Sequence, residues 1–181
     1  HVSAVTMQAL SGAGYPGVAS MDILGNVIPY IGGEEPKVEE EPLKILGDFK
    51  DGKVQDLAAK VSAHCNRVPV IDGHMLTVSV ELEQKPSKEE LLNAIQSFRG
   101  LPQQRNLPSA PAVPLVYMTE DNRPQPRRDG PRDGGMTVFM GRLRPCSIFD
   151  WKFVCLGHNT IRGAAGAAVL NAELMQSEGL L

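Results

Sequence analysis

The sequence lacks the long apolar segments and the cysteine patterns of membrane and secreted proteins. Its 181 residues contain no apolar stretch of the roughly 18 residues that a membrane-spanning helix needs, and the first residues do not resemble a signal peptide. The three cysteines, Cys65, Cys146 and Cys155, are an odd number without CxxC or CxxH spacing, which argues against a disulfide framework and a zinc site. We therefore expect free thiols, no metal, no membrane partner and a cytoplasmic location.

Clusters of basic residues are also missing. The formal net charge is -3, the isoelectric point is near 5.8, and the lysines and arginines are scattered along the chain. Such a chain has no general attraction to phosphate backbones, so we do not expect nucleic acid as a partner. The 42% hydrophobic and 22% charged residues are typical of one globular domain with a substantial core.

Alternating apolar and polar residues predict a sheet. Strands are expected at residues 2–10, 60–70, 75–82, 113–118, 136–143 and 147–156, with an extended segment at 26–31. The strands at 60–70 and 75–82 are separated by the turn Ile71-Asp72-Gly73, and we expect them to pair in one sheet. Because no initiator methionine precedes the first strand, we expect the chain to start inside a larger protein.

Helix signals lie between and after these strands. Helices are expected at residues 34–46, 88–98 and 161–175. Pro36 suits the first turn of the first helix, whereas Pro42 should kink that helix or delay its start. Ser87 and Glu90 form a capping box for the second, and Asn159 can cap the third. The sequence therefore predicts an α+β fold with a mixed, largely antiparallel sheet covered by helices on one face.

Residues 119–135 differ in composition from the rest of the chain. They carry Asp, Asn, Arg, Pro and Gly with hardly a large apolar side chain, as in PRRDGPRDGG. Such a segment cannot bury enough apolar surface to order itself. We expect a mobile surface loop.

Arg67 and His74 are the first candidates for chemistry. They lie seven residues apart in RVPVIDGH, whose bends could turn both side chains toward one cleft. Arginine suits bidentate recognition of a carboxylate, and histidine can exchange a proton near neutral pH. Taken alone, each residue type is more often structural, and His1, His64 and His158 show no ligand spacing and are read as structural.

Two further patterns are ambiguous by themselves. Glu34 and Lys37 have the i, i+3 spacing of an ion pair on a solvated helix face. The glycines of Gly12-x-Gly14-x-x-Gly17 match a dinucleotide fingerprint on paper, but Pro16 sits badly in the helix that this fingerprint needs. A tight turn whose backbone amides hold an oxyanion or phosphate is the alternative.

The combination of motifs is more specific than any one of them. Gln8 with SGAG, then NVIPYIGGEEPK, RVPVIDGH and HNTIRGAAG stand in the order found in aspartate-semialdehyde dehydrogenases. Over nearly its whole length the chain resembles the archaeal and fungal branch of that family. The resemblance implies a carboxy-terminal catalytic and dimerisation domain spanning residues 1–181, like that of glyceraldehyde-3-phosphate dehydrogenases. It also implies NADPH-dependent conversion of aspartyl phosphate to aspartate semialdehyde in the biosynthesis of threonine, methionine and, in some organisms, lysine.

The resemblance also implies roles for individual residues. His74 would be the general acid and base, and Gln8 would position the substrate carbonyl. Arg67 would clamp the substrate carboxylate, Glu34 would bind its amino group, and Lys37 would hold the phosphate. The NADP cofactor would be approached near its nicotinamide by Ser11, Gly12, Ala13, Gly14 and Asn159.

The sequence departs from the family pattern in one respect. The nucleophilic cysteine of the family lies in an SNCxT-type segment that is absent here, as is the preceding Rossmann domain. Cys65 is predicted to be a core or near-site residue, and Cys146 and Cys155 belong to later strands. We therefore expect the isolated chain to be inactive.

Two rival functions remain open at this point. Another acyl-reducing dehydrogenase on the same scaffold, such as malonyl-CoA reductase or N-acetyl-glutamyl-phosphate reductase, would share the thioester chemistry, but only an amino-bearing substrate needs Glu34. A non-catalytic dimerisation module would keep the site residues only as relics. In each case a homodimer is expected through the exposed face of the sheet.

Overall fold

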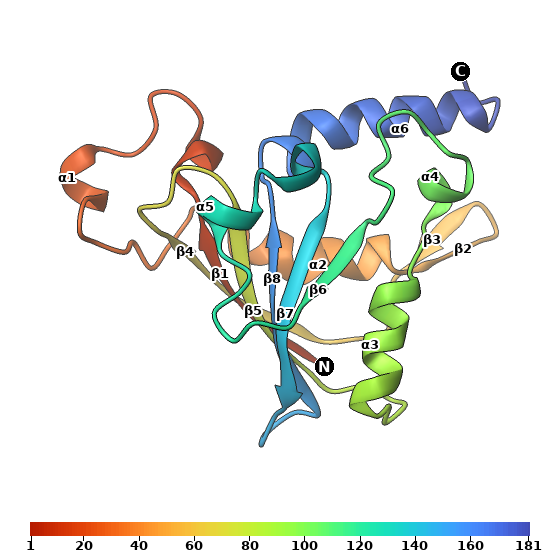
Figure 1. Ribbon diagram of the computed structural model, residues 1–181, viewed down its shortest axis with the longest axis horizontal. Helices are drawn as coiled ribbons and strands as arrows, with labels where there is room; N and C mark the ends of the chain where they lie inside the picture. Colours follow the sequence, from red (N-terminus) through yellow and green to blue (C-terminus); the bar gives the residue numbers. More distant parts are fainter.

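The computed structural model describes all 181 residues, His1–Leu181, and is built around a six-stranded sheet with the strand order β4-β1-β5-β8-β7-β6 (Figure 1). The pairs β1/β4 and β6/β7 are parallel, and the other three pairs are antiparallel. The strands are β1 (Val2–Gln8), β4 (Val61–Arg67), β5 (His74–Val80), β6 (Leu115–Met118), β7 (Val138–Pro145) and β8 (Trp151–Gly157). The predicted fold class, a mixed and largely antiparallel sheet with helices, is confirmed.

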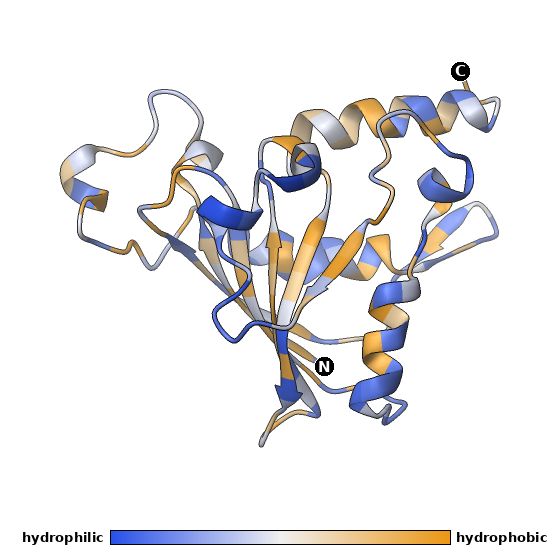
Figure 2. Ribbon diagram, viewed as in Figure 1, coloured by the Kyte–Doolittle hydropathy of each residue, from blue (hydrophilic) through white to orange (hydrophobic).

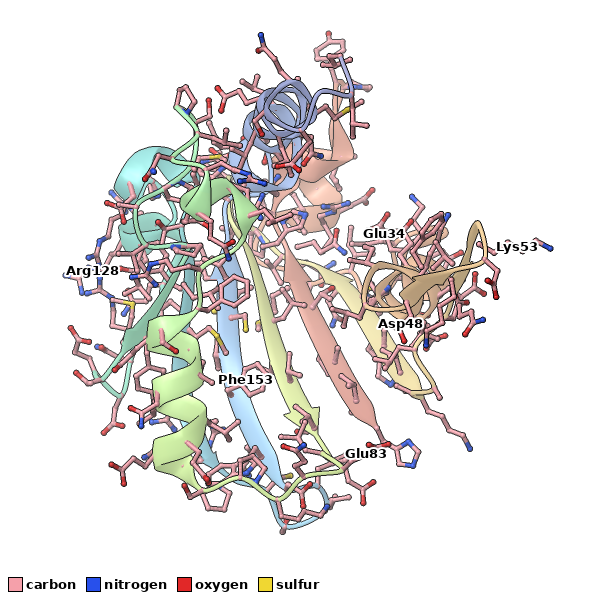
Figure 3. All side chains as sticks on the ribbon, turned by 90° about the vertical axis from the view of Figure 1, so that its right-hand side faces the viewer. Glu34, Asp48, Lys53, Glu83, Arg128 and Phe153 are labelled. Carbon is pink, nitrogen blue, oxygen red and sulfur yellow. The ribbon has the colours of Figure 1, made fainter.

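Helices lie beside and above this sheet. The longer ones are α2 (Glu34–Ile45), α3 (Lys88–Ser97) and α6 (Gly166–Ser177), and the short ones are η1 (Leu10–Ala13), α1 (Ser20–Ile23), α4 (Leu101–Gln104), α5 (Pro126–Asp129), η2 (Arg132–Gly135) and η3 (Ile161–Ala165). A separate two-stranded ribbon joins β2 (Asp48–Lys50) to β3 (Lys53–Gln55). Helices α2 and α3 flank one face of the sheet, with Phe153 between them (Figure 3). No helix is long and apolar enough to cross a lipid bilayer.

The pairing of β4 and β5 differs from the prediction. Strands β4 and β5 belong to the same sheet, but β1 lies between them, parallel to β4 and antiparallel to β5. The segment between them passes over the end of β1, where the amide of Leu10 donates to the carbonyl of Val70. Alternation of side chains predicts that a segment is a strand, but it does not identify the neighbour. The predicted direct pairing of these two strands is therefore wrong.

Helix α2 begins at the predicted residue and continues through Pro42. Proline removes one intrahelical N–H, which a helix tolerates near its end when packing against a strand supports it. Capping of α3 by Ser87 and Glu90 is confirmed, because both bonds of the capping box are present. Residues 26–31 form no regular strand; only Ile28 pairs, in an isolated antiparallel bridge with Arg67.

The buried core has two centres. Met118, Phe139 and Leu156 pack together on one face of the sheet, and Leu107, Met136 and Leu170 pack beneath α6. Apolar residues are frequent along the central strands and on α6, whereas the short helix α5 is strongly polar (Figure 2). Truncation of a fully buried aromatic such as Phe139 to alanine costs about 3–5 kcal/mol. The sheet is thus a firm support for side chains at its ends.

Residues 119–135, which were predicted to be a mobile loop, contain α5, η2 and a buried carboxylate. Asp129 is 0% exposed and accepts hydrogen bonds from the Arg123 guanidinium and from the Gln125 amide. Arg132 adds an ion pair at 3.5 Å and lies over the Phe139 ring. Composition alone overlooked this polar network, which gives the segment secondary structure. Its mobility remains a prediction.

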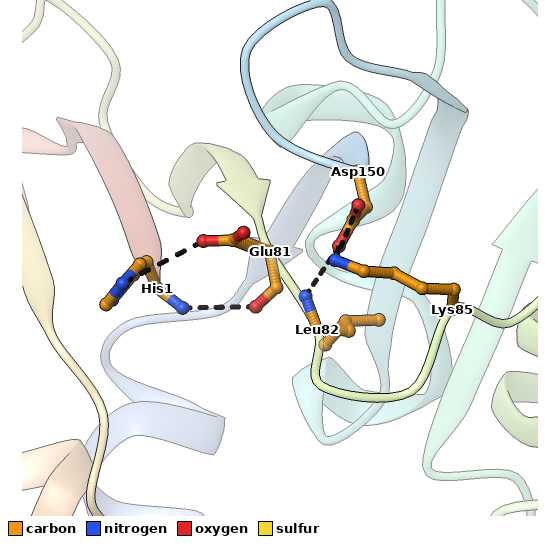
Figure 4. Close-up of polar contacts among 5 residues, drawn as sticks. All are labelled: His1, Glu81, Leu82, Lys85 and Asp150. Carbon is orange, nitrogen blue, oxygen red and sulfur yellow. Dashed lines mark hydrogen bonds and ion pairs between the residues drawn. The ribbon is translucent and has the colours of Figure 1, made fainter.

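The strand ends remote from the cavity described below are joined by polar contacts (Figure 4). The backbone nitrogen of His1 donates to the carbonyl of Glu81 at 3.1 Å. Asp150 accepts from the amide of Leu82 at 2.7 Å and from Lys85 at 2.8 Å. These contacts fix the start of β1 and the end of β5 against the turn before β8.

Candidate functional site

A cavity of about 690 Å³ opens at one end of the sheet. Gln8 ends β1 and Arg67 ends its parallel neighbour β4, while His74 begins β5, which runs antiparallel to β1. Those directions bring Gln8 to the same sheet end as Arg67 and His74, which lie about 60 residues later in the chain. Of the residues singled out from the sequence, those that line the cavity are Gln8, Ser11, Gly12, Ala13, Gly14, Glu34, Arg67, His74 and Asn159.

The main chain of Ala9 holds two of these side chains. Its amide donates to Nδ1 of His74 at 3.1 Å, and its carbonyl accepts from Nη1 of Arg67 at 2.6 Å. Ala9 is fully buried directly after β1, with its backbone in the extended region. Because both polar groups of one rigid residue are used, Arg67 and His74 are fixed relative to each other.

His74 is electrically neutral at physiological pH. Burial lowers its pKa to about 4, the positive charge of Arg67 acts in the same direction, and Glu34 acts weakly against them. Since Nδ1 accepts the Ala9 amide proton, the single proton of the neutral ring is on Nε2. His74 therefore presents Nε2–H as a hydrogen-bond donor.

Arg67 is a buried cation, with only 6% of its surface exposed. Burial lowers its pKa, and the charge of Glu34 opposes that effect. A guanidinium has five N–H donors, and one of them is used by Ala9. The remaining donors can take part in a forked bond to a planar carboxylate.

Glu34 lies at the first residue of α2, opposite Arg67. Its carboxylate accepts from Nε2 of Gln8 at 3.2 Å and from Nζ of Lys37 at 3.3 Å. Burial acts to raise the pKa of Glu34, but these hydrogen bonds and the charges of Lys37 and Arg67 outweigh burial and leave the pKa lowered. The cavity thus contains one anionic group beside a cation and a neutral imidazole.

Lys37 is the predicted residue that does not line this cavity. It reaches the site only through Glu34, and 59% of its side chain is exposed. It lines a neighbouring surface hollow with Glu34 instead. The expected convergence thus holds for Arg67, His74 and Glu34, while Lys37 lies at the margin.

Gly12 makes the closest approach to the catalytic candidates. A Cβ atom at this position would lie 3.0 Å from Nη1 of Arg67 and 3.0 Å from Nε2 of His74. Only a residue without a side chain leaves room for both groups there. Gly12 lies in the short helix η1 and Gly14 ends it, and no helix begins between Gly14 and Gly17 as a dinucleotide fingerprint requires.

Asn159 connects two parts of the cavity wall. Its Oδ1 accepts from the amide of Gly73 at 2.8 Å, and its Nδ2 donates to Oγ of Ser11 at 2.8 Å. The predicted helix cap is wrong, because the residue before η3 is Thr160 and no side chain caps that helix. The side-chain amide of Asn159 instead links the turn that precedes His74 to Ser11.

The cavity wall also includes residues that the sequence did not single out, namely Ile31, Gly32, Thr160 and Ala164. All of them lie within the motifs NVIPYIGGEEPK and HNTIRGAAG, and membership of these motifs is the signal that could have found them. Ala9 was missed for a different reason, since it acts through its backbone and has an unremarkable side chain.

None of the three cysteines lines the cavity. Cys65 is fully buried, as predicted, and burial raises its pKa. Burial also raises the pKa of Cys155 to about 12, which makes this thiol a poor nucleophile. Cys146 has a lowered pKa because it accepts backbone hydrogen bonds, but it follows β7 at the opposite end of the sheet. No group of His, Cys, Asp and Glu has the arrangement of a metal site.

Comparisons with known proteins agree with the sequence motifs. Residues 1–162 match the family described as "Semialdehyde dehydrogenase, dimerisation domain". The aspartate-semialdehyde dehydrogenase of Methanothermobacter thermautotrophicus is 53% identical over 94% of this chain, and that of Schizosaccharomyces pombe is 46% identical over all of it. The crystal structure of the Candida albicans enzyme with NADP superposes with a TM-score of 0.91 at 40% identity, covering 99% of this chain and 51% of that one. The chain spans about half the length of the curated relatives it matches.

Proposed function

Because this chain belongs to the family of semialdehyde dehydrogenase dimerisation domains, we propose that it forms the substrate-binding and proton-transferring half of an NADP-dependent aspartate-semialdehyde dehydrogenase. The complete enzyme would convert L-aspartyl 4-phosphate to L-aspartate 4-semialdehyde and phosphate. The observation that carries this proposal is that Glu34, Arg67 and His74 meet in one cavity.

The charges in that cavity suit a small zwitterion. The forked donors of Arg67 would bind the α-carboxylate, and the carboxylate of Glu34 would bind the α-ammonium group. Both groups are held before a substrate arrives, Arg67 by Ala9 and Glu34 by Gln8. Such fixed partners reduce the entropy that must be lost when the substrate is oriented.

Lys37 would bind the phosphate group by moving from its contact with Glu34. The contact is 3.3 Å long and the lysine is well exposed, so little is lost when it breaks. The exposed position of Lys37 suits binding of a phosphate group that enters and leaves the site, whereas the buried Arg67 suits a group that stays bound.

Proton transfer would involve Nε2 of His74. In the complete enzyme a cysteine thiolate would attack the acyl phosphate, forming a thioester and releasing phosphate. Reduction of the thioester carbonyl gives an alkoxide, which would accept a hydrogen bond from the Nε2–H group of His74. The alkoxide would share this proton while it exists and leave it on the ring when it collapses to the aldehyde and the thiolate, so that the imidazole ends neutral. The Ala9 amide keeps Nδ1 as an acceptor, so Nε2 is the nitrogen that faces the substrate.

NADPH would supply the hydride for this reduction. The wall of the cavity fits its nicotinamide end, because Gly14 has open space where a side chain would be and Asn159 retains one amide N–H beyond its bond to Ser11. The nucleotide-binding domain expected in the remaining half of the enzyme would hold the rest of the cofactor.

We further propose that two copies of the chain associate through the face of the sheet opposite α2 and α3. Thr77 points to that face and is exposed although its strand, β5, lies in the middle of the sheet. An exposed residue on a central strand, in a domain whose family is a dimerisation domain, favours sheet-to-sheet pairing.

A comparison of substrates in the complete enzyme tests the proposed function. We expect Glu34→Gln to weaken the use of aspartate semialdehyde at least ~10-fold in kcat/KM, since one charge-assisted bond is lost. Arg67→Lys should do the same, and His74→Ala should lower kcat. The isolated chain should show no turnover. Activity toward a substrate without an amino group that exceeds activity toward aspartate semialdehyde would favour the rival reductases, and no activity at all would favour a relic module.

A further inference from the structure

The edge strand β4 requires partners for its outward backbone groups. It is the first strand of the sheet and pairs only with β1, so alternate N–H groups point away from the sheet. Unpaired edge groups invite water or another chain, and proteins cover them. From Ala63 to the end of β4 these outward groups belong to Ala63, Cys65 and Arg67, and all three are hydrogen-bonded.

Helix α2 supplies two of the acceptors from its side chains. The amide of Ala63 donates to Oε1 of Glu39 at 2.9 Å, and the amide of Cys65 donates to Oε1 of Glu35 at 3.0 Å. The amide of Arg67 donates to the carbonyl of Ile28 at 2.9 Å. The outward face of the edge strand is therefore closed by two glutamates and one carbonyl.

The match between helix and strand has a geometric reason. Four residues of an α-helix rise about 6 Å, and two residues of a β-strand rise about 6.6 Å. Two glutamates four residues apart on α2, Glu35 and Glu39, can thus meet two amides that are two residues apart on β4. This side-by-side arrangement fixes the helix along the strand in one register.

The same helix provides the acidic residue of the cavity. Glu34 faces Gln8 in the cavity, whereas the next residue, Glu35, bonds to β4 only two residues before Arg67. The carboxylate of Glu34 and the guanidinium of Arg67 are therefore linked by a short path through Glu35 and Cys65. Their electrostatic coupling is seen in the pKa of each, since Glu34 raises that of Arg67 and Arg67 lowers that of Glu34.

We propose that Glu35 is a positioning residue that sets the separation between Glu34 and Arg67, and thereby the fit of the cavity to the ammonium and carboxylate groups of one substrate. This inference rests on the proposed function for the identity of the substrate. The bond between Glu35 and the edge strand stands independently of it.

The experiment uses the complete enzyme and four changes on α2. Glu35→Ala removes the acceptor, Glu35→Asp shortens it by one methylene group and keeps the charge, and Glu35→Gln keeps an oxygen acceptor at full length. Glu40→Ala is the matched control, because Glu40 is exposed on the same helix and its side chain, unlike those of Glu35 and Glu39, bonds to no amide of β4. Amide hydrogen exchange and steady-state kinetics are measured for each variant.

In Glu35→Ala and Glu35→Asp we expect the amide of Cys65 to exchange at least about tenfold faster, while the amide of Ala63 stays protected by Glu39. The KM for aspartate semialdehyde should rise about tenfold with kcat within about twofold, because both ends of the substrate clamp separate while His74 stays in place. Glu35→Gln should restore KM to within about threefold of the wild type. Glu40→Ala should match the wild type in both measurements.

Several results would overturn the proposal. A protected Cys65 amide in Glu35→Asp would show that the bond is not what closes this edge. Faster exchange of the Cys65 amide with an unchanged KM would show that the bond does not position Glu34 and Arg67. A loss of kcat alone would assign Glu35 to the chemical step. If Glu35→Ala fails to fold, the comparison of Glu35→Asp with Glu35→Gln decides. If the wild type does not use aspartate semialdehyde, the proposed function fails, while amide exchange at Cys65 compared with Ala63 still decides whether Glu35 holds the edge.

Discussion

The backbone amide of Ala9 donates a hydrogen bond to Nδ1 of His74 across 3.1 Å. This bond determines which nitrogen of the neutral ring carries the proton, and it does so without any contribution from the Ala9 side chain. The imidazole that we propose as the general acid is thus oriented by the main chain at the end of β1.

We expect His74 to remain neutral from pH 8 down to about pH 5. Its pKa is lowered to about 4 from 6.5, so between these two values the unfolded chain binds a proton at this residue and the folded chain does not. Folded-state stability should therefore rise with pH across this window and fall on acidification. Nitrogen chemical shifts of the imidazole would show the Nε2–H tautomer throughout. Titration of His74 with a midpoint above 6 would contradict the structure, and His74→Asn should flatten the pH dependence of stability.

Gly12→Ala should impair the site while leaving the fold intact. The added methyl group would meet Arg67 and His74 at 3.0 Å, so these side chains must shift by several tenths of an ångström. We expect kcat/KM of the complete enzyme to fall about 100-fold, because small displacements of positioned groups are costly in catalysis. Gly163→Ala is the control, since its methyl group would find its nearest atom at 3.7 Å. Equal activities of the two variants would show that the cavity tolerates the methyl group.

Asp129→Asn should destabilise the chain by about 3 kcal/mol, because it leaves Arg123 and Arg132 facing a neutral partner in a buried position. Urea unfolding would measure this loss, and hydrogen exchange should increase within residues 119–135. Asp133→Asn provides the comparison: Asp133 is exposed, and asparagine tolerates its positive φ of 51°. If both variants unfold at the same urea concentration, the network around Asp129 does not order this segment.

A glutamate at position 77 should dissociate the proposed dimer. Thr77 is an exposed residue of a central strand, so the new charge would be buried without a partner on association. Sedimentation at micromolar concentration should show dimers for the wild type and monomers for Thr77→Glu. Ser147→Glu introduces the same charge in the exposed turn before β8 and should stay dimeric. A monomeric wild type, or a dimeric Thr77→Glu variant, would remove this face from the association.

The sequence carried enough information for most of the sheet, since side-chain alternation located β1, β4 and β5 within a few residues of their observed ends. It did not reveal that β1 lies between the other two, because alternation reports burial and not partnership. Asn159 was assigned a helix cap from its position in the chain, although Gly73 and Ser11, which are distant in sequence, use its amide. Local rules cannot anticipate partners supplied by the tertiary structure.

The candidate site shows the same division. Motif order identified Gln8, Glu34, Arg67 and His74, and all of them line one cavity. Motifs of reactive side chains do not reveal Ala9, because it acts through its backbone. They do not reveal Glu35 either, because its carboxylate bonds to a strand amide outside the cavity. Both roles depend on hydrogen bonds between segments that are distant in sequence.

The position of β1 in the sheet also affects how the chain folds during synthesis. Val2 pairs with Val61 and Val80, so β1 must wait for partners that are 59 and 78 residues later in the chain. At translation rates of about 5–20 residues per second, that interval is roughly 3–16 s. Nearly every contact of the cavity depends on these distant pairings, which are slow to form because long loops must close first. Newly made β1 is therefore a strand without neighbours for seconds, and we expect it to be a principal binding segment for chaperones on the ribosome.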